Sequence, residues 1–325
     1  MNTTATTARR APRAFSAGWG VAAALALVLL ALFPLTGANN YFLHVLIVIF
    51  LYVILGVGLD LVFGYCGQYS FAQAAFYGIG GYTAAILHRD LGWDLWATMP
   101  AGIVVAGLFG FMLGVPALRV AGHFLAIVTI AFQTIVFLLL SSWTSFTGGQ
   151  YGIEMPRIAP FSAFGVSREV GFYYFALIAM AVAVLIAWRL ATSRIGREWR
   201  SIKDDELLAK SIGLDTTRAK LVAFVASAAF AGAAGVIIVY YLQGAYPHDF
   251  AILTSATIIA MVIVGGRATI VGPILGAVVF TAMPEVLRAT EDYKLIIYGT
   301  LVILAMTFMP MGIVGLVRRQ SEKEG

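Results

Sequence analysis

Hydrophobic residues lie in long continuous runs that are separated by short polar stretches. Many of these runs are close to the roughly 20 residues that an α-helix needs to cross the hydrocarbon core of a bilayer. A membrane β-barrel would instead show alternating segments of about ten residues. The pattern therefore predicts an all-α, polytopic membrane protein with about ten transmembrane helices. The predicted segments are residues 19–37, 41–63, 71–88, 96–116, 123–141, 171–190, 220–242, 251–264, 270–288 and 295–315.

Two of these segments depart from a regular span. Residues 251–264 precede the sequence GGR and are short for a full crossing, so we expect a tilted, broken or re-entrant helix there. Residues 71–88 are rich in Gly, Gln and Ser, which favours an irregular segment. Whether residues 251–288 form two full spans or include a broken helix is left open by the sequence.

The amino-acid composition agrees with a membrane protein and argues against ATP binding, metal binding and nucleic-acid binding by this chain. Only 11% of the residues are charged, against about 25% in soluble proteins. The single cysteine, Cys66, excludes an internal disulfide and is interpreted as core filler. No GxxxxGK[ST] phosphate loop occurs, so the chain does not bind ATP by that device. The four scattered histidines predict no metal site, and the net charge of +5 is attributed to membrane topology rather than to nucleic-acid binding.

The distribution of basic residues predicts the orientation of the chain. Placing the N-terminus in the cytoplasm leaves 16 of the 21 Lys and Arg residues on the cytoplasmic side, as the positive-inside rule requires. The result is a transmembrane domain over residues 19–317 between cytoplasmic tails at 1–18 and 318–325. A long external loop covers residues 142–170, and the largest cytoplasmic loop covers 191–219. The basic and apolar start also resembles a signal peptide, but no clear cleavage site follows it.

The largest cytoplasmic loop concentrates charge. Residues 194–220, RIGREWRSIKDDELLAKSIGLDTTRAK, carry 12 of the 37 charged side chains of the chain. No Gly or Pro occurs over residues 197–212, and residues of high helix propensity dominate, which predicts a short helix. Gly213 suits the C-terminus of this helix, and Asp215 or Thr216 suits the N-cap of the next span.

The predicted helix is amphipathic and has two possible functions. It contains two favourable pairs at i,i+4 spacing, Glu206 with Lys210 and Arg200 with Asp204. The helix either lies on anionic lipid headgroups or docks a cytoplasmic partner. The acids at residues 204–206 would be repelled by anionic lipid, which favours docking. The apolar residues that we expect on one broad face are Trp199, Ile202, Leu208, Ala209 and Ile212.

Polar residues inside the apolar segments are candidates for a translocation pathway. Each is equally able to satisfy a hydrogen bond between helices, so both interpretations stay open. Asp60 is an acid inside the predicted span 41–63. It is either a solvated residue near the cytoplasmic end of that span, or a residue that lines the pathway or binds a helix end. The other candidates are Gln68, Ser70, Gln73, Thr129, Gln133 and Thr134.

Five blocks of sequence carry a resemblance to a known family. The longest is GLDLVFGYCGQYSFAQAAFYGIGGYTAAIL at residues 58–87, and TGGQYGIEMP follows at 147–156. With the charged loop, these blocks resemble the permeases of branched-chain amino acid ABC transporters over about residues 40–317. The TGGxxGI block is similar to the M-type permease rather than to its H-type partner. The other blocks are HFLAIVTIAF (123–132), VGGRATIVGPILGA (264–277) and FMPMGIVGL (308–316).

The resemblance implies a fold, a location and a set of partners. The implied fold is the all-helical permease of the vitamin B12 importer type, in the bacterial plasma (inner) membrane. The implied partners are a second, H-type permease, two cytoplasmic ABC ATPases that bind ATP and Mg²⁺, and an external or periplasmic substrate-binding protein. The chain itself is then a transport subunit without a cofactor and without enzyme activity. Docking of the ATPases is assigned to the charged loop, at Arg197, Arg200, Asp204, Asp205, Glu206 and Gly213.

Alternatives remain at the level of substrate and mechanism. Asp60 stands where the family commonly has Asn, and GGRAT at residues 265–269 stands where GGRGT is common. Relatives in the family carry urea, short amides or aromatic acids, so the sequence leaves the exact substrate open. It also leaves open whether the two permease chains of the transporter are different or identical. An ion-coupled secondary transporter would carry paired charges inside the membrane, and Asp60 is the candidate for such a role. A membrane enzyme would need a convergent set of catalytic residues, and the sequence shows none.

Overall fold

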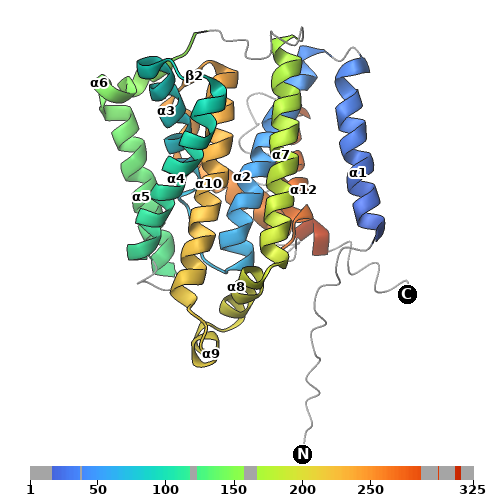
Figure 1. The fold of residues 1–325 in the computed structure, drawn as a ribbon, viewed down its shortest axis with the longest axis vertical. Helices are drawn as coiled ribbons and strands as arrows, with labels where there is room; N and C mark the ends of the chain where they lie inside the picture. Colours follow the sequence, from blue (N-terminus) through green and yellow to red (C-terminus); the bar gives the residue numbers. More distant parts are fainter. Residues whose placement is uncertain are drawn as a thin grey trace, which may run out of the picture.

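Upright helices make up most of the protein (Figure 1). A computed structural model describes residues 17–36, 39–117, 123–156, 167–286, 299 and 312–315. The long helices run roughly parallel to the long axis, with the short helices α8 and α9 at one end and β2 at the other. The long helices are α1 (Ala17–Leu32), α2 (Asn40–Asp60), α3 (Gln73–Leu91), α4 (Leu95–Ala117), α5 (His123–Ser142), α7 (Arg168–Thr192), α10 (Thr216–Leu242) and α12 (Val271–Val286). A shorter helix, α11 (Ile252–Gly265), precedes α12.

Short elements connect the long helices. A π-helix, Leu61–Tyr65, continues α2, and a two-residue antiparallel pair joins β1 (Ile153–Glu154) to β2 (Gly244–Ala245). The charged loop contains α8 (Arg194–Asp204) and α9 (Glu206–Ser211). The remaining short elements are α6 (Thr144–Thr147) and the 3₁₀ turns η1 (Phe33–Thr36), η3 (Gly149–Tyr151) and η5 (Pro247–Phe250).

Long apolar helices confirm a polytopic membrane protein. Within the described residues, five helices are long and apolar enough to cross a bilayer. Each of the first nine predicted segments contains a described helix. Most of the tenth, at residues 295–315, lies outside the described residues. So do most of both tails and residues 157–166 of the external loop. The five candidate spans are Asn40–Tyr65, Leu95–Pro116, Phe124–Ser142, Arg168–Thr192 and Thr216–Leu242.

Small residues let α3, α4 and α10 pack closely at the centre of the bundle. A Cβ atom on Gly80 of α3 would lie 2.4 Å from the Cα atom of Gly232 of α10. A Cβ atom on Gly102 of α4 would lie 2.4 Å from a methyl carbon of Val236. Side chains larger than hydrogen do not fit at such crossings, so the small residues bring the backbones together, as in other membrane helix pairs.

Two segments of chain are interrupted inside the bundle. After the π-helix, the chain loses helical structure until α3 starts at Gln73. The Gln73 side chain donates to the Leu55 carbonyl, which belongs to the interior of α2, so α3 begins between the two ends of that helix. Similarly, α10 leads through β2 and η5 into α11, which has only 14 residues. The expectation of a short helix at 251–264 is therefore confirmed. The expectation of an irregular segment at 71–88 was wrong, because α3 is a regular helix from Gln73 onward and the irregular stretch precedes it.

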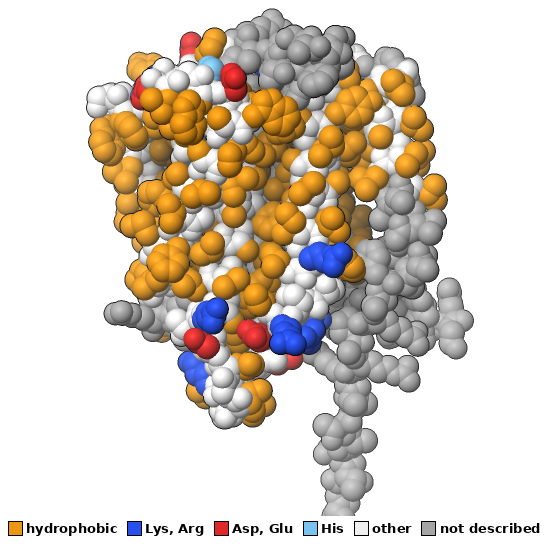
Figure 2. Space-filling model, viewed as in Figure 1, with side chains coloured by type: hydrophobic (Ala, Val, Ile, Leu, Met, Phe, Trp, Pro, Cys, Tyr) orange, Lys and Arg blue, Asp and Glu red, His pale blue; other side chains and the backbone are white. Residues whose placement is uncertain are grey.

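The outer surface separates apolar from charged residues. Figure 2 shows hydrophobic side chains over the middle of the helices and basic and acidic side chains around α8 and α9. Large apolar residues on several helices are exposed, including Leu108 at 57%, Ile127 at 61% and Ile178 at 61%. An apolar belt of this kind suits contact with lipid tails.

Candidate functional site

The charged loop folds into two helices rather than one. Ser193 is the N-cap of α8, where its side chain accepts a hydrogen bond from the Gly196 N–H. At Asp205 the backbone is extended, with φ −157° and ψ 110°, and the Asp205 carboxylate accepts from the Leu208 N–H at 3.0 Å. Asp205 therefore ends α8 and caps α9. The prediction of one continuous helix was wrong, because a side chain that can cap a helix interrupts the run of good helix formers.

Two contacts fasten this loop to α10. The Trp199 indole N–H donates to the Ala219 carbonyl at 2.7 Å, and the Trp199 side chain is fully buried. The Lys220 ammonium lies 2.6 Å from the Glu206 carboxylate, and the Lys220 side chain is only 4% exposed. Lys210 contacts the other Glu206 oxygen at 3.1 Å, which confirms the predicted i,i+4 pair. The loop is therefore attached to a spanning helix and is not a free arm.

Electrostatics favour the ionised form of Glu206. Burial raises the pKa of its carboxyl, but hydrogen bonds from Lys220 and Lys210 and the two positive charges outweigh burial and hold the pKa below its ordinary value. Both carboxylate oxygens are therefore engaged within the chain. Glu206 was predicted to face a partner, but its geometry serves the attachment of α9 to α10.

Three large apolar residues are exposed on α9 and at its C-terminal end. Leu207 is 78% exposed, Leu208 is 61% exposed and Ile212 is 68% exposed. We call these three residues the α9 tip. The predicted apolar face holds only in part, because Trp199, Ile202 and Ala209 are buried while Leu208 and Ile212 point outward. Sequence reasoning missed Leu207; the adjacent pair Leu207–Leu208 was the available signal, since two neighbours on a helix cannot share one narrow face.

The other predicted docking residues lie elsewhere on the loop and make different contacts. Arg200 donates to the carbonyls of Gly196 and Ala191 rather than pairing with Asp204 as predicted. Arg197 and Asp204 are exposed. Gly213 has φ +85° and open space around it, which confirms a turn that favours glycine. Asp215 caps α10 by accepting from the Arg218 N–H, as expected.

Most of the predicted pathway residues satisfy backbone groups at the two interruptions. Gln133 of α5 accepts from the Ala75 N–H near the start of α3 and donates to the Phe250 carbonyl at 2.7 Å. Ser255 of α11 accepts from the Ala74 N–H at 2.8 Å. One side chain of α5 therefore links two breaks that are distant in sequence, and irregular backbone inside a membrane requires such partners.

The remaining polar candidates have similar contacts. Gln73 is 1% exposed and bonds to both the Leu55 carbonyl and the Ser227 hydroxyl. Thr129 accepts from the Phe71 N–H at 3.0 Å. The sequence left two interpretations open for these residues, a role in the pathway and a hydrogen bond that joins helices. The contacts of Gln73 and Thr129 are hydrogen bonds of the second kind. Of the rest, Ser70 accepts from the Ala72 N–H, Gln68 donates to the Cys66 carbonyl, and Thr134, which is exposed, donates to the Ile130 carbonyl of its own helix.

Asp60 binds the turn between α11 and α12. It is 1% exposed, so the interpretation as a solvated residue is wrong. One carboxylate oxygen accepts from the Ala268 N–H at 2.9 Å, and Ala268 has φ +57°. The other oxygen has no hydrogen-bond partner among the described residues. Asp60 thus fixes a strained turn that precedes α12. Of the interpretations that the sequence left open, this contact agrees with the one in which Asp60 binds the end of a helix.

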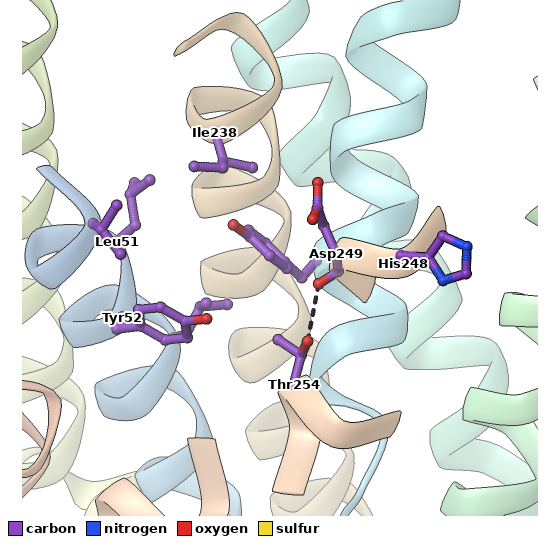
Figure 3. A pocket seen from close by; sticks show the side chains of 9 residues that line it. Leu51, Tyr52, Ile238, His248, Asp249 and Thr254 are labelled. Atoms are coloured by element: carbon purple, nitrogen blue, oxygen red, sulfur yellow. Dashed lines mark hydrogen bonds between the residues drawn. The ribbon is translucent and has the colours of Figure 1, made fainter. Parts of the chain in front are cut away.

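A cavity of about 230 Å³ lies between α2, α3, α10, η5 and the start of α11. Figure 3 shows Asp249 and Thr254 close together, with the Thr254 hydroxyl donating to the Asp249 backbone carbonyl at 3.0 Å. The His248 ring points away from Asp249 in the same view and lies 6.2 Å from the Phe137 ring centroid. The lining combines apolar and polar residues: Val48, Leu51, Tyr52, Leu55, Tyr77, Ile238, His248, Asp249 and Thr254.

These features define an α-helical membrane transport protein, because long apolar helices surround interrupted segments and a polar-lined cavity. Comparison with known sequences makes the class specific. A family model described as "Branched-chain amino acid transport system / permease component" matches residues 41–306. The chain belongs to this family.

Individual relatives agree with the family match. The chain is 34% identical over 293 residues to the high-affinity branched-chain amino acid transport system permease protein LivM of Salmonella typhimurium, covering 83% of this chain and 69% of the relative. LivM of Escherichia coli K12 gives the same identity and coverage. The permease protein LivH of Escherichia coli K12 is 26% identical over 286 residues, covering 81% of this chain and 91% of the relative. No solved structure gives a significant match.

Proposed function

We propose that this protein is the M-type permease subunit of an ATP-driven importer of branched-chain amino acids. The observation that carries the proposal is the family match over residues 41–306. The greater similarity to LivM than to LivH supports the M-type assignment. Relatives are named as transport permeases, and the apolar helices suit a multi-pass protein of the bacterial inner membrane.

The assembly follows from the same proposal. The chain pairs with an H-type permease, and two ABC ATPases that bind ATP and Mg²⁺ dock beneath the pair. A periplasmic substrate-binding protein delivers the amino acid to the opposite side. The full fold has about ten spans of the vitamin B12 importer type, and both termini lie in the cytoplasm with α8 and α9.

The ATPases dock on the α9 tip and the charged residues around it. Apolar residues that are exposed beside charges are typical of a protein interface. Arg197 and Asp204 are exposed on α8, and Gly213 and Asp205 shape the loop through the backbone. Movement of the docked ATPases would reach α10 directly, because Trp199 and Glu206 attach the loop to that helix.

The predicted pathway residues divide into two roles under this proposal. Asp60, Gln73 and Gln133 hold the interrupted segments in place through their hydrogen bonds. Thr134 is exposed on α5 and is free to face the pathway or a neighbouring subunit. Gln68, Ser70 and Thr129 position the non-helical stretch that precedes α3.

Co-purification and transport measurements test the function together. We expect the chain, isolated in mild detergent with its native partners, to be recovered with a second permease and with phosphate-loop ATPases. Reconstituted with the binding protein, this complex should take up leucine, isoleucine or valine only when ATP is supplied. Uptake that is driven by an ion gradient without ATP would overturn the proposal in favour of a secondary transporter. ATP-driven uptake of urea or short amides alone would overturn the substrate assignment.

A further inference from the structure

We propose that the cavity between α2, α3, α10 and η5 is a transient binding site for the amino acid inside this single permease chain. Asp249 receives the α-ammonium group, and the apolar wall formed by Val48, Leu51, Leu55 and Ile238 receives the branched side chain. This inference rests on the proposed function, because it takes the substrate class from there.

The position of the cavity suits a pathway site. Tyr52 lines it and lies 12 residues after the first residue of α2, or about 18 Å along the helix at 1.5 Å per residue. The π-helix ends another 13 residues beyond Tyr52, so the cavity lies well between the two ends of this span. Asp249 and His248 are exposed, so the cavity opens at the surface of the chain on that side.

The carboxylate of Asp249 has no ion pair with Lys or Arg among the described residues. Among the described residues, no side chain forms a hydrogen bond or ion pair with its carboxylate, and the neighbouring His248 ring points away from it (Figure 3). Its backbone is fixed, because its N–H donates to the Tyr246 carbonyl and its carbonyl accepts from Thr254. An ionisable residue within a helical membrane layer is costly and normally has a partner. A ligand ammonium group provides that partner while it occupies the cavity.

The size and lining of the cavity select a small amphipathic ligand. Its volume of about 230 Å³ is below the range of roughly 300–1,000 Å³ that is typical of sites for drug-sized ligands. Leu51 and Leu55 are buried on α2, and Ile238 is buried on α10, so the apolar wall is rigid. A single charged group facing an apolar wall fits a free amino acid with a branched side chain, whose carboxylate then lies toward the open rim.

Substrate-protected thiol labelling tests this site in the complete transporter. Val48→Cys changes a partly exposed lining residue to one of similar size, and the natural Cys66 is fully buried. The rate of labelling by a small neutral methanethiosulfonate is measured on this chain by mass spectrometry, with and without leucine. We expect leucine to slow labelling at least fivefold. We expect 3-methylbutylamine to protect as well, and 4-methylpentanoate, which lacks the ammonium group, not to protect.

A charge-neutralising variant shows whether the carboxylate binds the ligand. We expect Asp249→Asn, placed in the Val48→Cys chain, to abolish protection by leucine while the chain is still recovered with its partners. Asp90→Asn is the matched control, since Asp90 is an exposed carboxylate that already pairs with Arg89, and it should keep full protection.

The outcomes separate this site from the function on which it rests. A complex that imports leucine but shows no leucine protection overturns the site alone. Equal protection in Asp249→Asn, or equal protection by 4-methylpentanoate, also overturns the role of Asp249, and a basic residue of a neighbouring subunit is then its partner. A complex that imports no branched-chain amino acid overturns both the site and the proposed function.

Discussion

Asp205 illustrates how one side chain can have a local and an intermolecular role at the same position. It is exposed, so its charge is available to a docked ATPase, yet its carboxylate caps α9 through the Leu208 N–H. The cap is the contact that the structure shows. Asparagine caps a helix about as well as aspartate, whereas alanine does not. The two roles can therefore be separated by substitution.

We expect Asp205→Asn to retain leucine uptake within about twofold, and Asp205→Ala to lose most of it, because removing an N-cap costs about 0.5–2 kcal/mol and α9 is too short to form without it. Uptake is measured in cells at equal membrane levels of each variant. If Asp205→Asn is as defective as Asp205→Ala, the negative charge itself contacts the ATPase and the cap is secondary.

Some residue contacts could be predicted from the sequence, and others could not. The Asp215 cap, the Gly213 turn and the Glu206–Lys210 pair follow from local spacing, which is why they were predicted correctly. Arg200 was assigned to Asp204 by the same spacing rule, but it bonds instead to the Ala191 carbonyl at the end of α7 and to the Gly196 carbonyl of its own helix. The Ala191 carbonyl comes within reach because α7 and α8 meet at a corner, and spacing does not reveal a corner.

The α9 tip is the element whose exposed surface has no partner within the described residues. Leu207 is 78% exposed, so replacing it changes little inside the chain. We expect Leu207→Asp to reduce recovery of the ATPase and ATP-driven uptake at least tenfold, because a buried unpaired charge is poorly tolerated at an apolar interface. The matched control is Leu207→Met, which keeps an apolar side chain and should preserve both the recovery of the ATPase and ATP-driven uptake. Normal ATPase recovery with Leu207→Asp would place docking elsewhere on the loop.

The attachment of α9 to α10 has unequal partners. The Lys220 side chain is 4% exposed, whereas Glu206 is 30% exposed and also contacts Lys210. Removing Glu206 leaves a buried ammonium group without its counter-charge, and removing Lys220 leaves a carboxylate that is still paired and partly hydrated. We therefore expect Glu206→Gln to lower the thermal unfolding midpoint of the purified complex more than Lys220→Met does.

A double-mutant cycle completes that measurement. The Glu206→Gln, Lys220→Met double variant should be more stable than Glu206→Gln alone, because the unpaired ammonium group is gone. Equal destabilisation by the two single variants, with additive effects in the double variant, would contradict a pair in which the lysine is the buried member.

At the scale of the whole molecule, only one of the two interruptions was visible in the sequence, and the partners of neither were. The run at 251–264 is too short to cover a bilayer as a regular apolar helix, and α11 has only 14 residues. The Gly, Gln and Ser content of residues 71–88 predicted an irregular segment, but α3 is a regular helix and the non-helical stretch precedes it. The sequence did not show that the two interruptions meet. Gln133 of α5 bonds to Ala75 of α3, to Phe250 of η5 and to Ser255 of α11. Such a contact depends on the packing of three helices, which periodicity along one helix does not encode.

Gln133 is therefore expected to act on the stability of the whole bundle. It is fully buried, accepts from the Ala75 N–H, donates to the Phe250 carbonyl and also contacts the Ser255 hydroxyl at 3.4 Å. Gln133→Leu leaves these groups unsatisfied inside the protein, at about 1–3 kcal/mol for each buried group. We expect a clear fall in the thermal unfolding midpoint of the detergent-purified chain and faster proteolysis near residue 250.

The neighbouring residue provides the control for this prediction. Thr134 is exposed and bonds only to the Ile130 carbonyl of its own helix, so Thr134→Ala should leave the midpoint nearly unchanged. Gln133→Glu keeps acceptors for the Ala75 N–H but loses the donor to the Phe250 carbonyl, so its midpoint should fall between those of Gln133→Leu and the unaltered chain. If Gln133→Leu unfolds at the same temperature as Thr134→Ala while leucine uptake is lost, Gln133 serves the pathway rather than the junction of the two interruptions.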